Sequence, residues 1–156
     1  ARAVIEQHQG YINVKSQLRL LEVRREIDRL IARSAARRAT PTERNRFDEL
    51  AAAFEGAART SDDLAFMRTD HEFNEQCVLA SRKEFAAATM LLMQPLSRRF
   101  WCVHYKQAAV MLEAAKLHAA IARSIAAGDE EAAAAATDAL LDNIEAFTRA
   151  TVSVDA

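Results

Sequence analysis

The sequence predicts an all-α fold, an antiparallel bundle of six helices joined by short connections. The chain has 156 residues, of which only 3 are glycine and 2 are proline, and a β-rich fold would need more such residues in its turns. Apolar residues recur at intervals of three and four from residue 15 onward, which is the spacing of one helical face. Because 51% of the residues are hydrophobic, we expect one helical domain with a buried core over residues 15–156.

The first predicted helix spans about residues 15–38. Its apolar stripe consists of Leu20, Val23, Ile27, Leu30 and Ile31. The second helix starts after Thr40, because Pro41 suits a first turn and Glu43 completes a capping box. It ends near residues 56–60.

Caps also delimit the later helices. Residues 61–63 (Ser-Asp-Asp) cap a third helix that runs to about residue 80. A capping box from Ser81 to Glu84 opens a fourth helix, in which Pro95 is expected to cause a kink. Gly128 ends the fifth helix and Asp129 caps the sixth, which runs to about residue 152. The boundary between the fourth and fifth helices is not predicted, because residues 105–115 contain no helix breaker.

Charge and motif content exclude several classes of protein. The net charge is −1, which does not suit a domain that binds DNA through a basic surface. Two cysteines do not make a disulfide framework, and no apolar run has the length of a membrane span. No signal peptide, phosphate-binding loop or nucleophile elbow is visible, so we expect a cytoplasmic, soluble protein that is not an enzyme. Residues 1–14 differ in character and are interpreted as a tail or linker.

Polar side chains interrupt the predicted apolar faces of three helices. Asp70 and Asn74 are four residues apart and therefore share one helical face, which also carries phenylalanines. His118 and Arg24 occupy similar positions in two other helices. A buried charge needs a partner, so these groups either pair with one another in a solid core or converge on a cavity that binds a ligand. Spacing alone does not decide between the two interpretations.

The pair Asp70 and Asn74 also suggests a divalent metal site, with His118 as a third ligand from another helix. Asparagine is a weak neutral ligand, and the neighbouring His71 points about 100° away around the helix. His8 lies in the tail and His104 in the region without a predicted boundary. Both cysteines, Cys77 and Cys102, are interpreted as small core residues.

Four stretches of the sequence resemble one known family. They are residues 21–28 (LEVRREID), 70–74 (DHEFN), 117–129 (LHAAIARSIAAGD) and 130–141. Their order and spacing resemble the FCD domain, the effector-binding C-terminal domain of FadR-type GntR transcription regulators. The resemblance covers about residues 15–152. It implies a bundle of six or seven helices that forms a homodimer, binds a small metabolite in a central cavity, and follows a DNA-binding winged helix-turn-helix domain.

The resemblance also implies a set of site residues. Many members hold a metal with one aspartate and three histidines, of which Asp70 and His118 match two. Asn74 and Leu140 stand where the other two histidines are expected, so the metal site is degenerate and at most a weakly bound divalent ion is expected. Arg24 is the best candidate to bind an anionic effector, because a guanidinium offers two donors to a carboxylate. We therefore expect Arg24, Asp70, Asn74, His118 and Leu140 to surround a small organic acid.

Two other functions fit the sequence less well. The chain could be a helical oligomerisation or interaction module with a solid core and no ligand. A metal-dependent enzyme is a third possibility, and it would require a bound catalytic metal.

Overall fold

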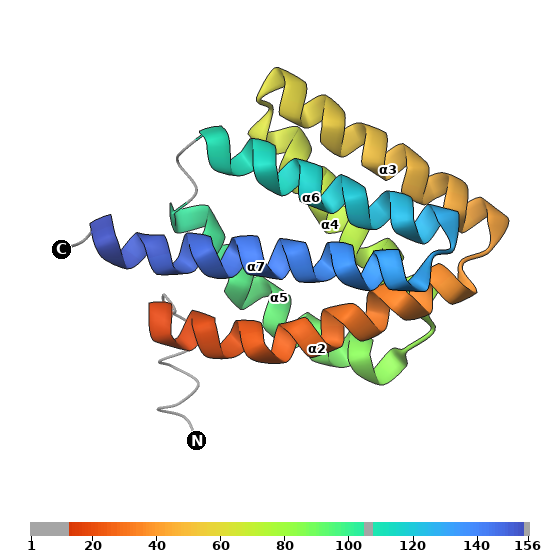
Figure 1. Ribbon diagram of the computed structural model, residues 1–156, viewed down its shortest axis with the longest axis horizontal. Helices are drawn as coiled ribbons and strands as arrows, with labels where there is room; N and C mark the ends of the chain where they lie inside the picture. The colour runs from red at the N-terminus through yellow and green to blue at the C-terminus, as the bar shows by residue number, and fades with distance from the viewer. Residues whose placement is uncertain (1–12, 105–107, 155–156) are drawn as a thin grey trace.

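The computed structural model describes residues 13–104 and 108–154, and this part of the chain forms six α-helices (Figure 1). They are α2 (Val14–Arg38), α3 (Pro41–Thr60), α4 (Asp63–Ser81), α5 (Glu84–His104), α6 (Ala108–Ala127) and α7 (Glu130–Val154). The predicted all-α bundle is confirmed. Among these described helices, none is apolar enough over a sufficient length to cross a membrane.

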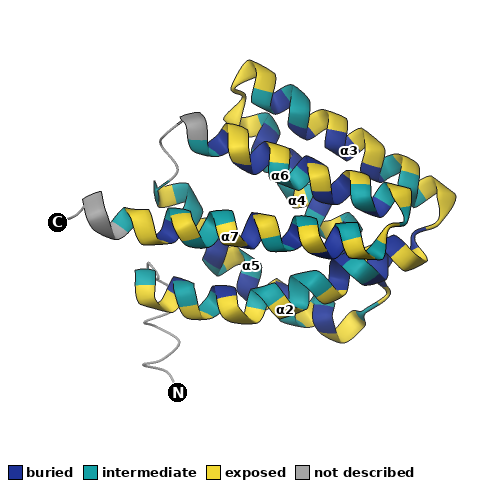
Figure 2. Ribbon diagram, in the orientation of Figure 1, coloured by how far each residue is buried: buried dark blue, intermediate teal, exposed yellow. Residues whose placement is uncertain are grey.

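The helices pack as antiparallel neighbours. In Figure 1, α2 and α7 lie side by side with opposite directions, and so do α3 and α6. Helix α4 contacts α2, α3 and α6, while α5 packs mainly against α2. Buried residues follow the inner faces of all these helices, and exposed residues follow the outer faces (Figure 2). Five helices, α2 and α4–α7, thereby surround the middle of the bundle.

Most predicted caps are present. Thr40 and Glu43 form the capping box of α3, with each side chain bonded to the other residue's backbone N–H. Asp62 caps α4 through the N–H of Ala65, and Asp129 caps α7 through the N–H of Ala132. Gly128 has φ of 72°, the left-handed conformation that favours glycine after a helix.

The predicted capping box at Ser81 is wrong. Ser81 is the last residue of α4, and Arg82 follows it in the left-handed conformation with φ of 52°. The Ser81 hydroxyl donates to the carbonyl of Val78 and accepts from the N–H of Lys83. Ser81 therefore belongs to the end of one helix rather than to the start of the next, and α5 begins at Glu84.

Other boundaries shift little. Helix α2 begins at Val14, one residue earlier than predicted, and Asn13 caps it through the N–H of Ser16. The rest of the predicted tail, residues 1–12, lies outside the described residues. Helix α5 continues through Pro95 to His104, and α6 starts at Ala108. This is the boundary that the sequence did not predict.

The apolar stripe predicted for the first helix is partly wrong. Ile31 is buried, but Val23 and Leu30 are 51% and 46% exposed. The inner face of α2 is rotated relative to that stripe and runs through Gln17 and Leu21 toward Ile31. A hydrophobic pattern misses this face because polar residues occupy much of it.

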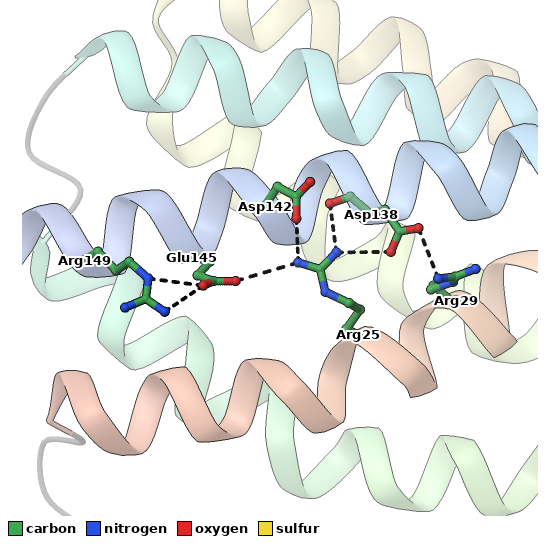
Figure 3. Close-up of polar contacts among 6 residues, drawn as sticks. All are labelled: Arg25, Arg29, Asp138, Asp142, Glu145 and Arg149. Atoms are coloured by element: carbon green, nitrogen blue, oxygen red, sulfur yellow. Dashed lines mark hydrogen bonds and ion pairs between the residues drawn. The ribbon is translucent and has the colours of Figure 1, made fainter.

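Ion pairs join the outer faces of α2 and α7. We call this group the α2–α7 ion-pair network, and Figure 3 shows its members, Arg25, Arg29, Asp138, Asp142, Glu145 and Arg149. Arg25 lies at its centre, with Nη1 3.1 Å from Asp138 and Nη2 2.6 Å from Asp142. Because these groups remain in contact with solvent, we expect the network to orient the two helices but to add little stability.

Candidate functional site

A cavity of about 120 Å³ lies among α2, α4, α5, α6 and α7. A single water needs about 10–15 Å³, so the cavity has space for several waters or a small organic molecule. All five predicted site residues line it, namely Arg24, Asp70, Asn74, His118 and Leu140. Residues far apart in the sequence, such as Arg24 and Leu140, therefore meet around one space. This arrangement differs from a solid core in which the polar groups only pair with one another.

Arg24 is held from two sides but is not fully paired. Its Nη1 donates to the Ser97 hydroxyl at 2.8 Å, and its Nη2 donates to Asp28 Oδ2 at 2.9 Å. The side chain is only 12% exposed, and its Nε is buried without a hydrogen-bond partner. An unpaired buried N–H is costly, so an acceptor from a ligand or a water would stabilise it.

Ser97 links α5 to the polar face of α2. Its Oγ accepts from Arg24 and also from Gln17 Nε2 at 3.1 Å. Because both neighbours donate, the hydroxyl retains its own proton for donation, and Ser97 lines the cavity. Gln17 is almost fully buried, and its Oε1 has no partner among the described residues.

Asp28 is the carboxylate that accompanies Arg24, one helical turn away. Burial raises the pKa of Asp28, and the charge and hydrogen bond of Arg24 oppose that rise without cancelling it. Keeping the Asp28 carboxylate ionised in this position therefore costs free energy. An arrangement in which a charged group is kept despite such a cost is common at functional sites.

A second polar cluster surrounds Asp70. His118 Nε2 lies 3.2 Å from Asp70 Oδ1, and Asn74 Nδ2 donates to the same oxygen at 3.2 Å. Arg98 Nη2 lies 3.4 Å from Oδ2. Burial by itself raises the pKa of Asp70, but the hydrogen bond and charge of His118, with the charges of Arg98 and Arg24, outweigh it and leave the pKa lowered. Asp70 is thus a stably ionised carboxylate.

The other ring nitrogen of His118 fixes the orientation of the imidazole. Nδ1 lies 2.6 Å from the carbonyl oxygen of Ala114, and a carbonyl only accepts, so Nδ1 carries a proton. Three aromatic rings surround the imidazole, Phe54, Phe66 and Phe73, with ring centroids 5.0, 5.7 and 5.8 Å away. They exclude water from one side of His118 and hold the ring toward the cavity.

Apolar side chains form the remaining wall. Leu140, Ile144 and Phe147 contribute from α7, and Trp101 contributes from α5, where its ring packs on Phe66 at 5.4 Å. The cavity lining therefore combines charged groups with apolar surface. A guest that fits it has an anionic or polar group and an apolar body.

The other candidate residues have different positions. His71 points outward and pairs with Glu75 at 3.2 Å, as predicted from its place on the helix. His104 packs against Phe100, and His8 lies outside the described residues. Both cysteines are free, Cys77 is buried, and burial raises the pKa of both thiols, so neither is an activated nucleophile.

Asp28 and Ser97 are among the polar cavity residues that the sequence did not predict, and it left Arg98 and Arg99 as alternatives for a second positive charge at the site. Asp28 follows Arg24 by four residues, so the i, i+4 spacing would have indicated it. The sequence could not show whether Arg98 or Arg99 points inward. The structure places Arg98 at the cavity and leaves Arg99 exposed. Ser97 gives no sequence signal, because isolated serines are common in helices.

The donor set does not fit a metal ion. A metal at Asp70 would need further anionic or imidazole ligands, but Leu140 is apolar and the Asn74 amide donates to Asp70. In the ranges 13–104 and 108–154, no group of three or more His, Cys, Asp and Glu residues is arranged to hold one. The guanidinium of Arg98 already contacts the Asp70 carboxylate.

These observations define the class of protein as a helical bundle with a ligand-sized cavity among its helices. A family model described as the FCD domain matches residues 19–143, most of the chain. The chain belongs to the FCD domain family, whose members are effector-binding domains of regulators. Searches of curated proteins and of solved structures gave no match.

Proposed function

We propose that this chain is the effector-sensing domain of a GntR-type transcription regulator and that its cavity binds a small carboxylic acid. The observation that carries the proposal is Arg24, a guanidinium that is only 12% exposed, lines the cavity, and has an Nε without a hydrogen-bond partner. A guanidinium binds a carboxylate with charge-assisted hydrogen bonds. The acid would supply the acceptor that Arg24 Nε lacks.

The rest of the cavity narrows the chemistry of the effector. The Ser97 hydroxyl would donate a second hydrogen bond beside Arg24, and Asp70 with His118 would position a polar substituent of the effector. Leu140, with the other apolar residues of α7, would contact the body of the molecule. We expect a small acid that carries an apolar or aromatic part.

Effector binding would act on DNA affinity through the geometry of a homodimer. An effector shifts an equilibrium only when it binds one arrangement better than another. The cavity lies among five helices, so a ligand that draws α2 and α5 together through Arg24 and Ser97 would change how these helices are presented to a partner. A winged helix-turn-helix domain in the same regulator would report this change, and the protein would work in the cytoplasm.

The exposed face of α5 supports dimerisation. Phe85 is 84% exposed, and Leu91 and Leu92 are each 75% exposed. Large apolar groups clustered on a helix surface are typical of protein–protein contacts. We predict that Leu92→Glu lowers the dimer fraction, measured by analytical ultracentrifugation. Leu64→Glu is a matched control on α4, because Leu64 is 65% exposed outside this face, and a dimer unaffected by Leu92→Glu would contradict the assignment.

The direct test is a thermal unfolding screen with small carboxylic acids and, as matched controls, their neutral primary amides. A ligand at one hundred times its Kd stabilises the folded state by about 2.7 kcal/mol. We expect at least one acid to raise the unfolding temperature, its amide to have little effect, and Arg24→Ala to remove the response. An acid that stabilises the Arg24→Ala variant equally would place binding elsewhere. No response to any acid would favour a ligand-free interaction module, for which the exposed face of α5 is the supporting observation.

A further inference from the structure

The Asp70 cluster contains a cation that belongs to the chain itself. His118 and Asn74 converge on Oδ1 of Asp70, and Arg98 of α5 approaches Oδ2 at 3.4 Å. Both carboxylate oxygens are therefore contacted by donors of this protein. A metal ion bound to Asp70 would have to displace Arg98 or lie beside its positive charge.

The charges that line the cavity also oppose a metal ion at Asp70. Its charged lining residues, among those that the structure describes, are two arginines and two aspartates, with His118 as a titratable fifth group. The guanidiniums of Arg24 and Arg98 balance the carboxylates of Asp28 and Asp70. No excess negative charge remains to attract a divalent cation, and repulsion between nearby like charges is strong in a partly buried site.

The ligand geometry also opposes a metal. Leu140 lines the same cavity from α7 and offers no donor atom. His118 Nδ1 is committed to the Ala114 carbonyl, so only Nε2 could bind a metal, and Nε2 already faces Asp70 Oδ1. The chain therefore has too few metal ligands around Asp70, and Arg98 supplies the positive charge that a metal ion would otherwise bring.

We infer that Arg98 takes the place of a metal ion at Asp70, so that this site is organised by a guanidinium and binds its effector without any metal. The biological meaning of this inference rests on the proposed effector site. Arg98 acts here as a positioning residue that holds Asp70, and through it His118 and Asn74, in one arrangement. It follows that Arg98, and not only the missing histidine at position 140, prevents metal binding.

The test measures Zn²⁺ binding by calorimetry on EDTA-treated, dialysed protein, with no effector present. Four variants are compared with the parent chain: Leu140→His, Leu140→His with Arg98→Ala, Leu140→His with Arg98→Lys, and Leu140→His with Arg68→Ala. Arg68 is an exposed arginine of α4 outside the cavity lining, so its removal is the matched control for charge. Circular dichroism verifies that each variant retains its helical content.

We expect the parent chain to show no Zn²⁺ site that depends on His118. Leu140→His adds an imidazole, but Arg98 remains beside Asp70, so binding stays weak. Removing Arg98 in that background lowers the Kd for Zn²⁺ at least about tenfold, a change of the size seen for groups next to metal ligands. Arg98→Lys retains the positive charge and leaves binding weak, and Arg68→Ala has no effect.

Two results would overturn the inference. One is stoichiometric Zn²⁺ binding by the parent chain that is lost in His118→Ala; binding at the exposed pair of His71 and Glu75 would survive that substitution. The other is equal Zn²⁺ affinity of Leu140→His with and without Arg98. Because only metal is titrated here, either failure is distinct from a failure of the acid screen, provided that the acid screen is also performed in EDTA.

Discussion

Arg24 and Arg25 are adjacent in α2 and both partly buried, but Arg25 faces α7 whereas Arg24 lines the cavity. Arg25 lies at the centre of the α2–α7 ion-pair network, where Asp138 and Asp142 accept from its two terminal nitrogens and solvent reaches the groups (Figure 3). Arg24 turns inward, is nearly buried, and retains an unpartnered Nε beside the cavity. Of these two arginines, the one with fewer protein partners lines the cavity, and it is the one that we propose to bind the effector. We expect the ion pairs of Arg25 to orient α2 against α7, and the incompletely paired guanidinium of Arg24 to accept a ligand.

The largest expected effect is that of Arg24→Ala. Removing the guanidinium leaves Asp28 as a largely buried carboxylate without its partner, so we expect the free energy of unfolding to fall by about 3–5 kcal/mol. Urea denaturation measures this loss. Acid binding should disappear while helical content is retained.

The matched double variant, Arg24→Ala with Asp28→Asn, separates stability from binding. It removes both charges, so we expect it to be more stable than Arg24→Ala alone and still unable to bind acid. If the double variant bound acid with unchanged affinity, Arg24 would not belong to the site.

The next effect in size is a difference in pH dependence between the two buried aspartates. The pKa of Asp70 is lowered below its usual 3.8 in the folded state, so its ionised form stabilises the fold above that value, and this stability is lost as the pH falls through the lowered pKa. We expect Asp70→Asn to cost about 1–3 kcal/mol at pH 7. The difference from the parent chain should shrink below pH 4.

Asp28 should behave in the opposite sense. Its pKa is raised in the folded state, so its ionised form is disfavoured at neutral pH and this cost is relieved as the pH falls through the raised pKa. Relative to Asp28→Asn, the parent chain should therefore gain stability on acidification. Unfolding measured from pH 3 to pH 7 checks both variants, and parallel curves for the two would contradict the assignment of their environments.

The smallest expected effect is that of Arg25→Ala. Exposed ion pairs contribute about 0–1 kcal/mol, and salt screens them. We expect a loss in that range, smaller in 1 M salt, with no change in acid affinity. A loss as large as that of Arg24→Ala would remove the distinction between the two environments.

The fold was largely predictable from the sequence because caps and helical periodicity are local signals. Thr40 with Glu43, Asp62 and Asp129 are placed as predicted. The error at Ser81 arose because a serine can bond the backbone of either flanking helix, and only the left-handed turn at Arg82 decides which. Tertiary packing, which a single sequence does not show, made that choice.

The cavity residues that interrupt apolar helix faces were predictable from the sequence. The cavity residues of the inner face of α2 were missed, because that face is itself partly polar. Arg24, Asp70 and His118 interrupted such faces and line the cavity. The inner face of α2 was misplaced because Gln17 and Asp28 belong to it, while Val23 and Leu30 lie at the surface. A hydrophobic pattern cannot detect an interior that is itself built from charges.

Binding of the effector's carboxylate by the Arg24 guanidinium is the proposal on which the other predictions depend. A crystal structure of the chain with the acid that gives the largest thermal shift, grown in EDTA, tests this claim most directly. We predict a carboxylate within hydrogen-bond distance of the Arg24 guanidinium, with its apolar part against Leu140. An acid bound outside the cavity, or one whose carboxylate lies away from Arg24, would contradict it.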